Sequence, residues 1–304
     1  MPCSNSSAEM TRRELLALAA APLGEPGILV HEHVLVDFTG AGRYDAGEVF
    51  RLAKPRLEEV ARLGCRRFQD CTPAFLGRDP RLLARLADAT GIEIWTNTGI
   101  YGAANQRYVP AFARAASAAE LAAGWVKEAR TGVAGVRPRF IKTGVNRGPL
   151  DELDRKLVRA AALASRESGL AIASHTGNGA AALEQLAILA EERVAAEKFV
   201  WVHAQSERDH AIHAQAGRAG AWVEFDGIAP KTADWHLECV RFMAAGGLLG
   251  RTLISQDSGW YHVGEPGGGD FRGYAYLYTG FLPRLDAAWR RALLWDNPRR
   301  AFGA

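Results

Sequence analysis

The sequence predicts an α/β fold, in which eight parallel strands alternate with helices as a single-domain (β/α)8 TIM barrel. Short apolar runs alternate with amphipathic stretches from Gly27 onward, which is typical of repeated strand–helix units. No glycine-rich phosphate loop follows the first run, as it would in the alternative, a doubly wound open sheet. No linker interrupts the 304 residues. We therefore expect one barrel domain over 27–304, preceded by an N-terminal extension or export signal over 1–26.

Eight short apolar runs are the candidate strands. In chain order they are Ile28–Val36, Arg67–Cys71, Ile92–Thr98, Arg139–Thr143, Leu170–Ser174, Phe199–Val202, Ala221–Phe225 and Arg251–Ser255. Helical patterns follow the first seven runs, at Glu48–Leu63, Pro80–Thr90, Ala118–Thr131, Leu150–Ser168, Ala180–Val194, Asp209–Ala219 and Asp234–Ala245. A long glycine-rich loop follows the eighth run, and a helix around Leu285–Leu294 comes after it.

Composition excludes several classes of protein. Hydrophobic residues make up 48% of the chain and charged residues 23%, a balance typical of soluble globular proteins. The net charge is +3, and the basic residues are scattered, so we expect no nucleic-acid partner. No apolar stretch reaches the length of a membrane span. The cysteines form no CxxC pair, and Cys65 and Cys71 are expected to be buried free thiols.

The N-terminus leaves the localisation open. The segment from Thr11 to Leu16 contains Arg12-Arg13 and is followed by a short apolar stretch from Ala17 to Leu23. This order is similar to a twin-arginine export signal, which would direct the protein to the periplasm. The apolar stretch is short for such a signal, and an N-terminal extension of a cytoplasmic protein is the alternative.

Two histidines lie near the end of the first run. His31 and His33 are two residues apart, so on a strand their side chains project to the same face. One face of a barrel strand is the interior, where imidazoles are costly unless something binds them. An HxH pair also occurs on surface strands, so it indicates a metal site only together with suitable residues at the ends of other strands.

Four more polar residues stand at the ends of later runs. Lys142 ends the fourth run, His175 the fifth, His203 the sixth and Asp257 the eighth. Barrel enzymes build their sites at the carboxyl-terminal face of the strands, so we expect all six residues to meet there. Imidazoles and a carboxylate suit zinc or another borderline divalent ion. The sequence therefore predicts a metal site at this face.

Lys142 is the unusual member of this set, because an ammonium group repels cations. Burial favours the free amine of a lysine, and a carboxylated amine would be an anion able to bridge two metals. The alternative is a buried ion pair between Lys142 and Asp257. Two metals about 3.5–4 Å apart would hold a bridging hydroxide that is nucleophilic at neutral pH. Asp257 could accept its proton during attack.

These residues resemble the phosphotriesterase-like family of the amidohydrolase superfamily. The motifs that carry the resemblance are His31-Glu32-His33, Asp70-Cys71-Thr72, Gly77-Arg78-Asp79, Thr98-Gly99-Ile100-Tyr101, Ile141-Lys142, Ser174-His175-Thr176, His203, Asp257 and Asn297-Pro298. Together they span the chain from Gly27 to its end.

The resemblance implies a binuclear metal-dependent hydrolase that cleaves an ester or lactone bond. It implies that His31, His33 and Asp257 hold the more buried metal. His175 and His203 would hold the more exposed one, and carboxylated Lys142 would bridge the two. The implied ions are zinc, with manganese, cobalt or iron as alternatives.

Two departures from the family pattern weaken the expectation of an organophosphate triester hydrolase, which stays an alternative. Ala204-Gln205-Ser206 follows His203, where the phosphotriesterase type carries an acidic pair. Gly227 follows Asp226, where relatives have His or Arg, and this also weakens the expectation of the usual lactonase. The residues also leave open a mononuclear amidohydrolase or deaminase, and a non-catalytic ligand-binding barrel.

Three aromatic residues are the candidates for substrate binding. Tyr101 follows the third run beside the metals, and Trp260 and Tyr261 lie in the loop after Asp257, where their rings would wall a pocket. The alternative is a surface loop that packs on the barrel rim. The expected substrate is a small ester, lactone or phosphotriester, and an exposed aromatic rim would suit a homodimer. The remaining histidines with helical spacing, at positions 210, 213 and 236, are expected to be exposed.

Overall fold

The structure is a computed structural model that describes residues 26–40 and 42–303, so the arginine-containing segment near the N-terminus lies outside the described residues. The strands are β1 (Gly27–Val36), β2 (Cys65–Asp70), β3 (Glu93–Trp95), β4 (Asn97–Thr98), β5 (Phe140–Val145), β6 (Ile172–Thr176), β7 (Phe199–Val202), β8 (Trp222–Phe225), β9 (Thr252–Ile254) and β10 (Gly259–His262). The α-helices are α2 (Ala46–Arg62), α3 (Pro80–Thr90), α4 (Ala111–Ala115), α5 (Ala118–Thr131), α6 (Glu152–Ser168), α7 (Gly179–Glu191), α8 (His210–Arg218), α9 (Ala233–Ala245), α10 (Ala287–Arg291) and α11 (Asn297–Phe302).

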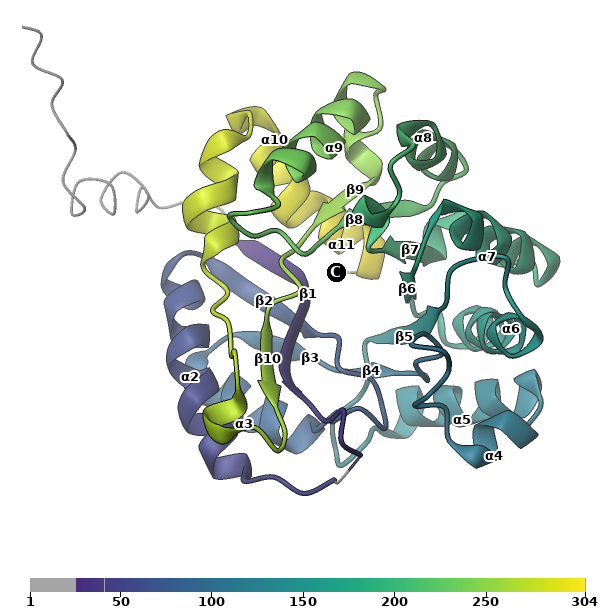
Figure 1. The fold of residues 1–304 in the computed structure, drawn as a ribbon, viewed down its shortest axis with the longest axis horizontal. Helices are drawn as coiled ribbons and strands as arrows, with labels where there is room; N and C mark the ends of the chain where they lie inside the picture. The colour runs from purple at the N-terminus through teal and green to yellow at the C-terminus, as the bar shows by residue number, and fades with distance from the viewer. Residues whose placement is uncertain (1–25, 41, 304) are drawn as a thin grey trace, which may run out of the picture.

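All pairs of neighbouring strands are parallel, which confirms the predicted α/β class. The strands form two sheets, with the orders β10-β1-β2-β3 and β4-β5-β6-β7-β8-β9. They lie around a common centre with the helices outside (Figure 1). Single backbone hydrogen bonds connect the two sheets: Arg139 N–H donates to Thr96 O at 2.9 Å, and Asp257 N–H donates to His31 O at 3.0 Å.

The helices begin and end where local chemistry favours it. Asp45, Asp79 and Asp151 accept backbone N–H groups at the starts of α2, α3 and α6, which satisfies donors that have no partner within the helix. Gly91 and Gly169 end α3 and α6 in the left-handed conformation that glycine adopts readily. None of the described helices is long and apolar enough to cross a membrane.

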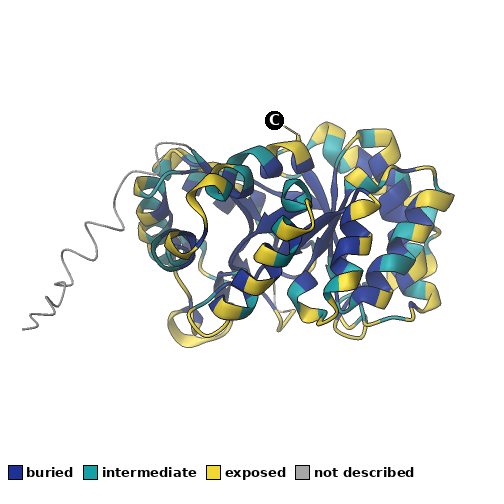
Figure 2. Ribbon diagram, turned by 90° about the horizontal axis from the view of Figure 1, so that it is seen from above, coloured by how far each residue is buried: buried dark blue, intermediate teal, exposed yellow. Residues whose placement is uncertain are grey.

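Alternate strand residues form two apolar clusters. The outer cluster joins strand residues such as Ile141 to buried helix residues such as Leu57 and Leu82. The inner cluster contains alternate strand residues such as Phe140 and Trp222, and no described residue of α2–α9. The buried strands lie between more exposed outer helix faces (Figure 2). Since alternation fixes which side chains point to the centre, it also fixes which polar strand residues meet there.

A bulge in β1 aims the two histidines at the centre. Ile28 and Val30 belong to the inner cluster, so simple alternation would turn His31 and His33 outward. The register with β2 shifts, because Leu29 pairs with Phe68 whereas Glu32 pairs with Asp70. Three steps on β1 therefore match two on β2, and this extra residue reverses the alternation.

The glycine-rich loop after Asp257 contains a strand that the sequence did not predict. β10 pairs with β1 in parallel, with Gly259 opposite His33 and Tyr261 opposite Leu35. The backbones approach so closely that a Cβ on Gly259 would lie 1.7 Å from His33 O. The strand is short and begins at a glycine, so its sequence looks like a loop.

Gly99 and Gly91 offer a matched pair of substitutions. Both have positive φ, +116° and +70°, but a Cβ on Gly99 would lie 2.2 Å from Lys142 O, whereas open space surrounds Gly91. We expect Gly91→Ala to cost roughly 1–2 kcal/mol of unfolding free energy for its backbone conformation. Gly99→Ala should cost at least about twice as much because Lys142 must move. Urea unfolding measures both, and equal losses would contradict this close approach.

Candidate metal centre

The carboxylate of Asp257, in the segment after β9, lies close to two ring nitrogens of β1. Asp257 Oδ1 lies 3.1 Å from His33 Nε2 and 3.7 Å from His31 Nε2. His33 Nδ1 lies 2.9 Å from Thr72 Oγ1, whose hydroxyl donates to Leu35 O. The hydroxyl therefore accepts from Nδ1–H, which leaves a lone pair on Nε2. Asp257 Oδ1 has no other partner among the described residues, so it and Nε2 of the neutral imidazole are two acceptors that face each other. A cation fits between such groups.

His31 is oriented in the same way. Its Nδ1 lies 2.9 Å from Glu224 Oε1 and 3.1 Å from Asp226 Oδ2, so Nδ1 carries the proton and Nε2 is free. Burial, with Lys142 beside the ring, lowers the pKa of His31 to about 4. Burial opposes ionisation of Asp257, but His31 and His33 outweigh it and hold its pKa below the usual range. A neutral imidazole beside an ionised carboxylate is the state that binds a divalent ion.

His175 and His203 form the second half of the site. Their rings lie 4.3 Å apart, centroid to centroid, and His203 lies 5.2 Å from His31. His203 Nδ1 donates to Asp226 Oδ1, so the lone pair of the neutral ring is on Nε2. Burial opposes protonation of His203, but Asp226 outweighs it and raises its pKa. Burial, with His203 and Lys142 nearby, lowers the pKa of His175 well below its usual value. The atoms of His31, His203 and Asp257 lie close enough together to hold one ion.

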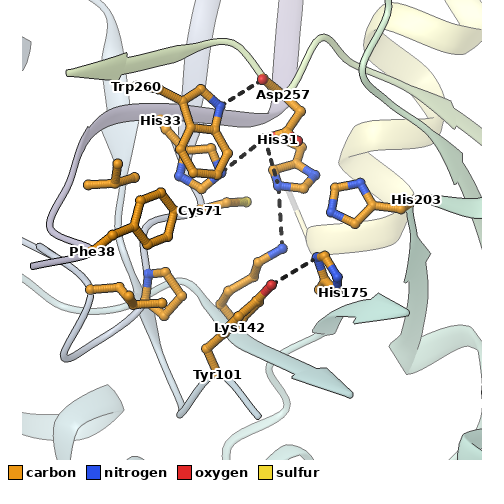
Figure 3. A pocket seen from close by; sticks show the side chains of 13 residues that line it. His31, His33, Phe38, Cys71, Tyr101, Lys142, His175, His203, Asp257 and Trp260 are labelled. Carbon is orange, nitrogen blue, oxygen red and sulfur yellow. Dashed lines mark hydrogen bonds and ion pairs between the residues drawn. The ribbon is translucent and has the colours of Figure 1, made fainter. Parts of the chain in front are cut away.

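Lys142 lies between the two halves. Its side chain is 2% exposed, and its Nζ lies 3.4 Å from His31 Nε2. The ion pairs among the described residues do not include one between Lys142 and Asp257, so the structure does not support the alternative role of Lys142. The structure thus brings all six predicted ligands together, as Figure 3 shows for their side chains.

Two of the ligands depend on unusual backbone conformations. By strand alternation Val202 points to the centre, so His203 would point outward, but His203 has φ +64°. Asp257 has φ +49° in the segment after β9. Such conformations cost about 1–3 kcal/mol in residues other than glycine and are concentrated at functional sites.

Glu32, for which the sequence indicated no separate role, holds the segment that carries Asp257. Its Oε1 accepts from Ser255 Oγ–H at 2.9 Å and Gln256 N–H at 3.0 Å, and its Oε2 accepts from Ser258 N–H at 2.7 Å. Burial raises the pKa of Glu32 to about 8, and these three donors oppose that rise. Glu32 thus fixes the residues on both sides of Asp257.

Glu224 and Asp226 were also missed as site residues. With Trp222 they occupy alternate positions from β8 onward, so all three point to the centre, and both carboxylates contact His31. Burial, followed by Asp226, raises the pKa of Glu224 well above its usual value. Burial also opposes ionisation of Asp226, but His203 and His31 outweigh it and hold that pKa well below the usual range. The alternation of residues 222, 224 and 226 was the signal that could have found them.

His213 and His236 are buried, so the expectation that they are exposed is wrong. Each donates from Nε2 to a backbone oxygen near the site: His213 to Ala204 O at 2.7 Å, and His236 to Asp226 O at 2.5 Å. Each of these two carbonyl groups lies just after the end of a strand, β7 or β8. A histidine of the following helix donates the hydrogen bond that such a buried carbonyl oxygen needs.

The six candidate ligands line one side of a pocket of about 90 Å³. Tyr101 and Trp260 line it, as expected, and Tyr101 O–H lies 3.4 Å from His175 Nδ1. Tyr261 does not line it: on β10 it faces away from Trp260 and packs against Phe271. Phe38 and the buried free thiol of Cys71 line the pocket without having been expected to do so. Figure 3 shows Phe38 and Trp260 across the pocket from His175 and His203.

The fold and site define an α/β protein with buried candidate ligands for divalent ions at the ends of parallel strands. The model of the phosphotriesterase family matches residues 15–302, and the chain therefore belongs to the phosphotriesterase family. The phosphotriesterase homology protein of Escherichia coli is 27% identical over 288 residues, which cover 90% of this chain and 97% of that protein.

Two further relatives carry names of activities. The aryldialkylphosphatase of Saccharolobus solfataricus is 30% identical over 184 residues, which cover 58% of this chain and 57% of that protein. The crystal structure of a lactonase from Listeria monocytogenes aligns with a TM-score of 0.79 at 22% identity, covering 91% of this chain and 94% of that one. The expected resemblance to the phosphotriesterase-like family is confirmed, and members of this family are hydrolases.

Glu32→Gln tests the support of Asp257. Above pH 8, where Glu32 is ionised, the amide group of glutamine would bring an N–H against the N–H of Ser258. We expect metal affinity to fall about 10–100-fold, as it does when groups behind metal ligands are changed. Asp154→Asn is a matched control, because Asp154 is buried and accepts from Asn146 N–H but contacts no candidate ligand. Equal metal affinity in both variants would contradict the role of Glu32.

Proposed function

We propose that this protein is a binuclear metal-dependent hydrolase that cleaves an ester or lactone bond. The observation that carries the proposal is the position of Asp257 Oδ1, which is buried without a hydrogen bond among the described residues and lies 3.1 Å from His33 Nε2 and 3.7 Å from His31 Nε2. The single backbone hydrogen bond between Asp257 and His31 suits a closed (β/α)8 barrel with the metals at its carboxyl-terminal face.

The donor set suits two ions, with zinc as the first choice and manganese, cobalt or iron as alternatives. His31, His33 and Asp257 would hold one, and His175 and His203 the other. When bound, two such ions would supply a hydroxide that is nucleophilic at neutral pH and would polarise the carbonyl oxygen of the substrate.

Lys142 requires a change of charge in this proposal. A buried ammonium 3.4 Å from His31 Nε2 would repel an ion bound to that nitrogen. The ammonium group would first lose a proton, and the neutral amine would then take up carbon dioxide and release a second proton, which leaves a carbamate anion that could bridge both ions. We therefore propose carboxylated Lys142 as the bridging ligand.

The chain's own residues supply the remaining steps. Asp257 is ionised and faces the pocket, so it can accept a proton as the nucleophile attacks. Tyr101 O–H lies beside His175 and can donate to a substrate oxygen. Phe38, Leu76 and Trp260 line the pocket, where apolar groups exclude water and suit an apolar part of the substrate.

The side chains of the pocket offer no separate site for an anionic part of the substrate. Among the described residues that line it, Lys142 is the one Lys or Arg side chain, so apart from the proposed ions no cationic group is free to pair with an anion. A small ester or lactone fits this description, and so does a phosphotriester. The name of the aryldialkylphosphatase relative supports the phosphotriester as the second candidate. The homodimer and both cellular compartments stay predictions from the sequence.

A metal analysis combined with a substrate panel tests the proposed function. We expect about two equivalents of metal per chain and turnover of lactones or aryl esters above that of phosphotriesters. One equivalent per chain would favour a mononuclear amidohydrolase. Fully loaded protein without activity on the whole panel would favour a non-catalytic ligand-binding barrel.

Lys142→Ala should lose both ions or most of the activity, because the bridging anion is removed. A short carboxylic acid in the assay should restore part of the activity by taking the place of the carboxylated side chain. Lys54→Ala is the control, since Lys54 pairs with Glu58 on the outer helix α2. Full activity of Lys142→Ala without added acid would rule out a bridging role.

Asp257→Asn should keep much of the metal but lower kcat about 10²–10⁴-fold, because an amide oxygen can bind an ion but cannot accept the proton. Steady-state kinetics at saturating substrate, combined with metal analysis of the same sample, measure both effects. An unchanged kcat would remove Asp257 from the proton path.

A further inference from the structure

Asp226 contacts one predicted ligand in each half of the site. Its Oδ2 lies 3.1 Å from His31 Nδ1, and its Oδ1 accepts from His203 Nδ1. Its Oδ2 also accepts from the backbone N–H of His203 at 3.0 Å. His31 belongs to the half with His33 and Asp257, and His203 to the half with His175. The orientation of two imidazoles therefore depends on where one buried carboxylate lies.

Gln205 holds that carboxylate in place with two hydrogen bonds. Its Nε2 donates to Asp226 Oδ1 at 2.8 Å, and its Oε1 accepts from Asp226 N–H at 3.1 Å. The backbone oxygen of Gln205 accepts from Trp235 Nε1 at 2.9 Å, so Gln205 is itself fixed against α9. A side chain that bonds both the backbone and the carboxylate of Asp226 limits the rotation of that carboxylate.

We propose that Gln205 is a positioning residue for both metal ions, because it acts through Asp226 on one histidine ligand in each half of the site. This inference rests on the proposed two-metal function. The amide suits the task better than a carboxylate, since an acidic side chain at this position would face Asp226 Oδ1 with a like charge. Gln205 would thus orient ligands, whereas the acidic residues that the family pattern places after the sixth-strand histidine could carry protons.

Thr72 provides an internal comparison. Its Oγ1 accepts from His33 Nδ1–H at 2.9 Å, and none of its other hydrogen bonds to described residues involves His175, His203 or Asp226. A change at Thr72 should therefore disturb one half of the site, whereas a change that releases Asp226 should disturb both. The number of ions affected separates positioning through Asp226 from a general loss of packing.

The test uses Gln205→Met, which keeps the length of the side chain but removes both hydrogen bonds. Metal-free full-length protein is titrated with Co²⁺, and the visible absorption and the bound equivalents are followed. We expect the affinity for both ions to fall about 10-fold or more and the Co²⁺ spectrum to change. Thr72→Val, which removes the acceptor behind His33, should weaken one ion. Gln106→Met should weaken neither, although it also removes amide hydrogen bonds to carboxylates.

Unchanged affinity and spectrum in Gln205→Met would overturn the inference, and so would a loss limited to one ion. Asp226→Asn gives a second measurement, and it should weaken both ions more strongly than Gln205→Met. If the unmodified protein itself binds fewer than two Co²⁺ ions, the proposed function fails instead. The two failures are therefore distinguishable.

Discussion

Buried hydrogen-bond acceptors behind the ligand histidines are the constraint on which the site depends. A buried N–H group must have a partner, and Thr72, Glu224 and Asp226 supply partners for the Nδ1 atoms of three imidazoles. Each ring therefore presents the lone pair of Nε2 to the pocket. The arrangement leaves acceptors facing one another, which is unfavourable without a cation and favourable with one.

The backbone brings the candidate ligands to the centre in two ways: by the alternation of side chains along a strand, and by local departures from that alternation. β5 and β6 deliver Lys142 and His175 to the centre by alternation alone. β1 needs a bulge to turn His31 and His33 inward, and His203 and Asp257 need left-handed backbone conformations. Glu32 holds the segment around Asp257, and Gln205 holds Asp226, which contacts His203. The positions of the candidate ligands therefore depend on hydrogen bonds made by residues behind them.

The strand ends were predictable from the sequence because apolar runs in parallel sheets carry polar residues at one edge, and the six residues predicted as ligands do line one pocket. The bulge was not predictable, since it depends on how β1 pairs with β2. Asp226 and Glu224 were missed for a related reason: their importance comes from contact with His31, which is almost two hundred residues away in the chain. The sequence places Tyr261 in the pocket because β10 looks like a loop, whereas its pairing with β1 turns Tyr261 away.

Anomalous diffraction from crystals of the zinc-loaded protein tests the central claim most directly. The account predicts two zinc peaks, one within bonding distance of His31 Nε2, His33 Nε2 and Asp257 Oδ1, and one beside His175 and His203. It also predicts continuous density from Lys142 Nζ to a carboxyl group between the peaks. A single peak, or an unmodified Lys142 between two peaks, would contradict the bridged two-metal site.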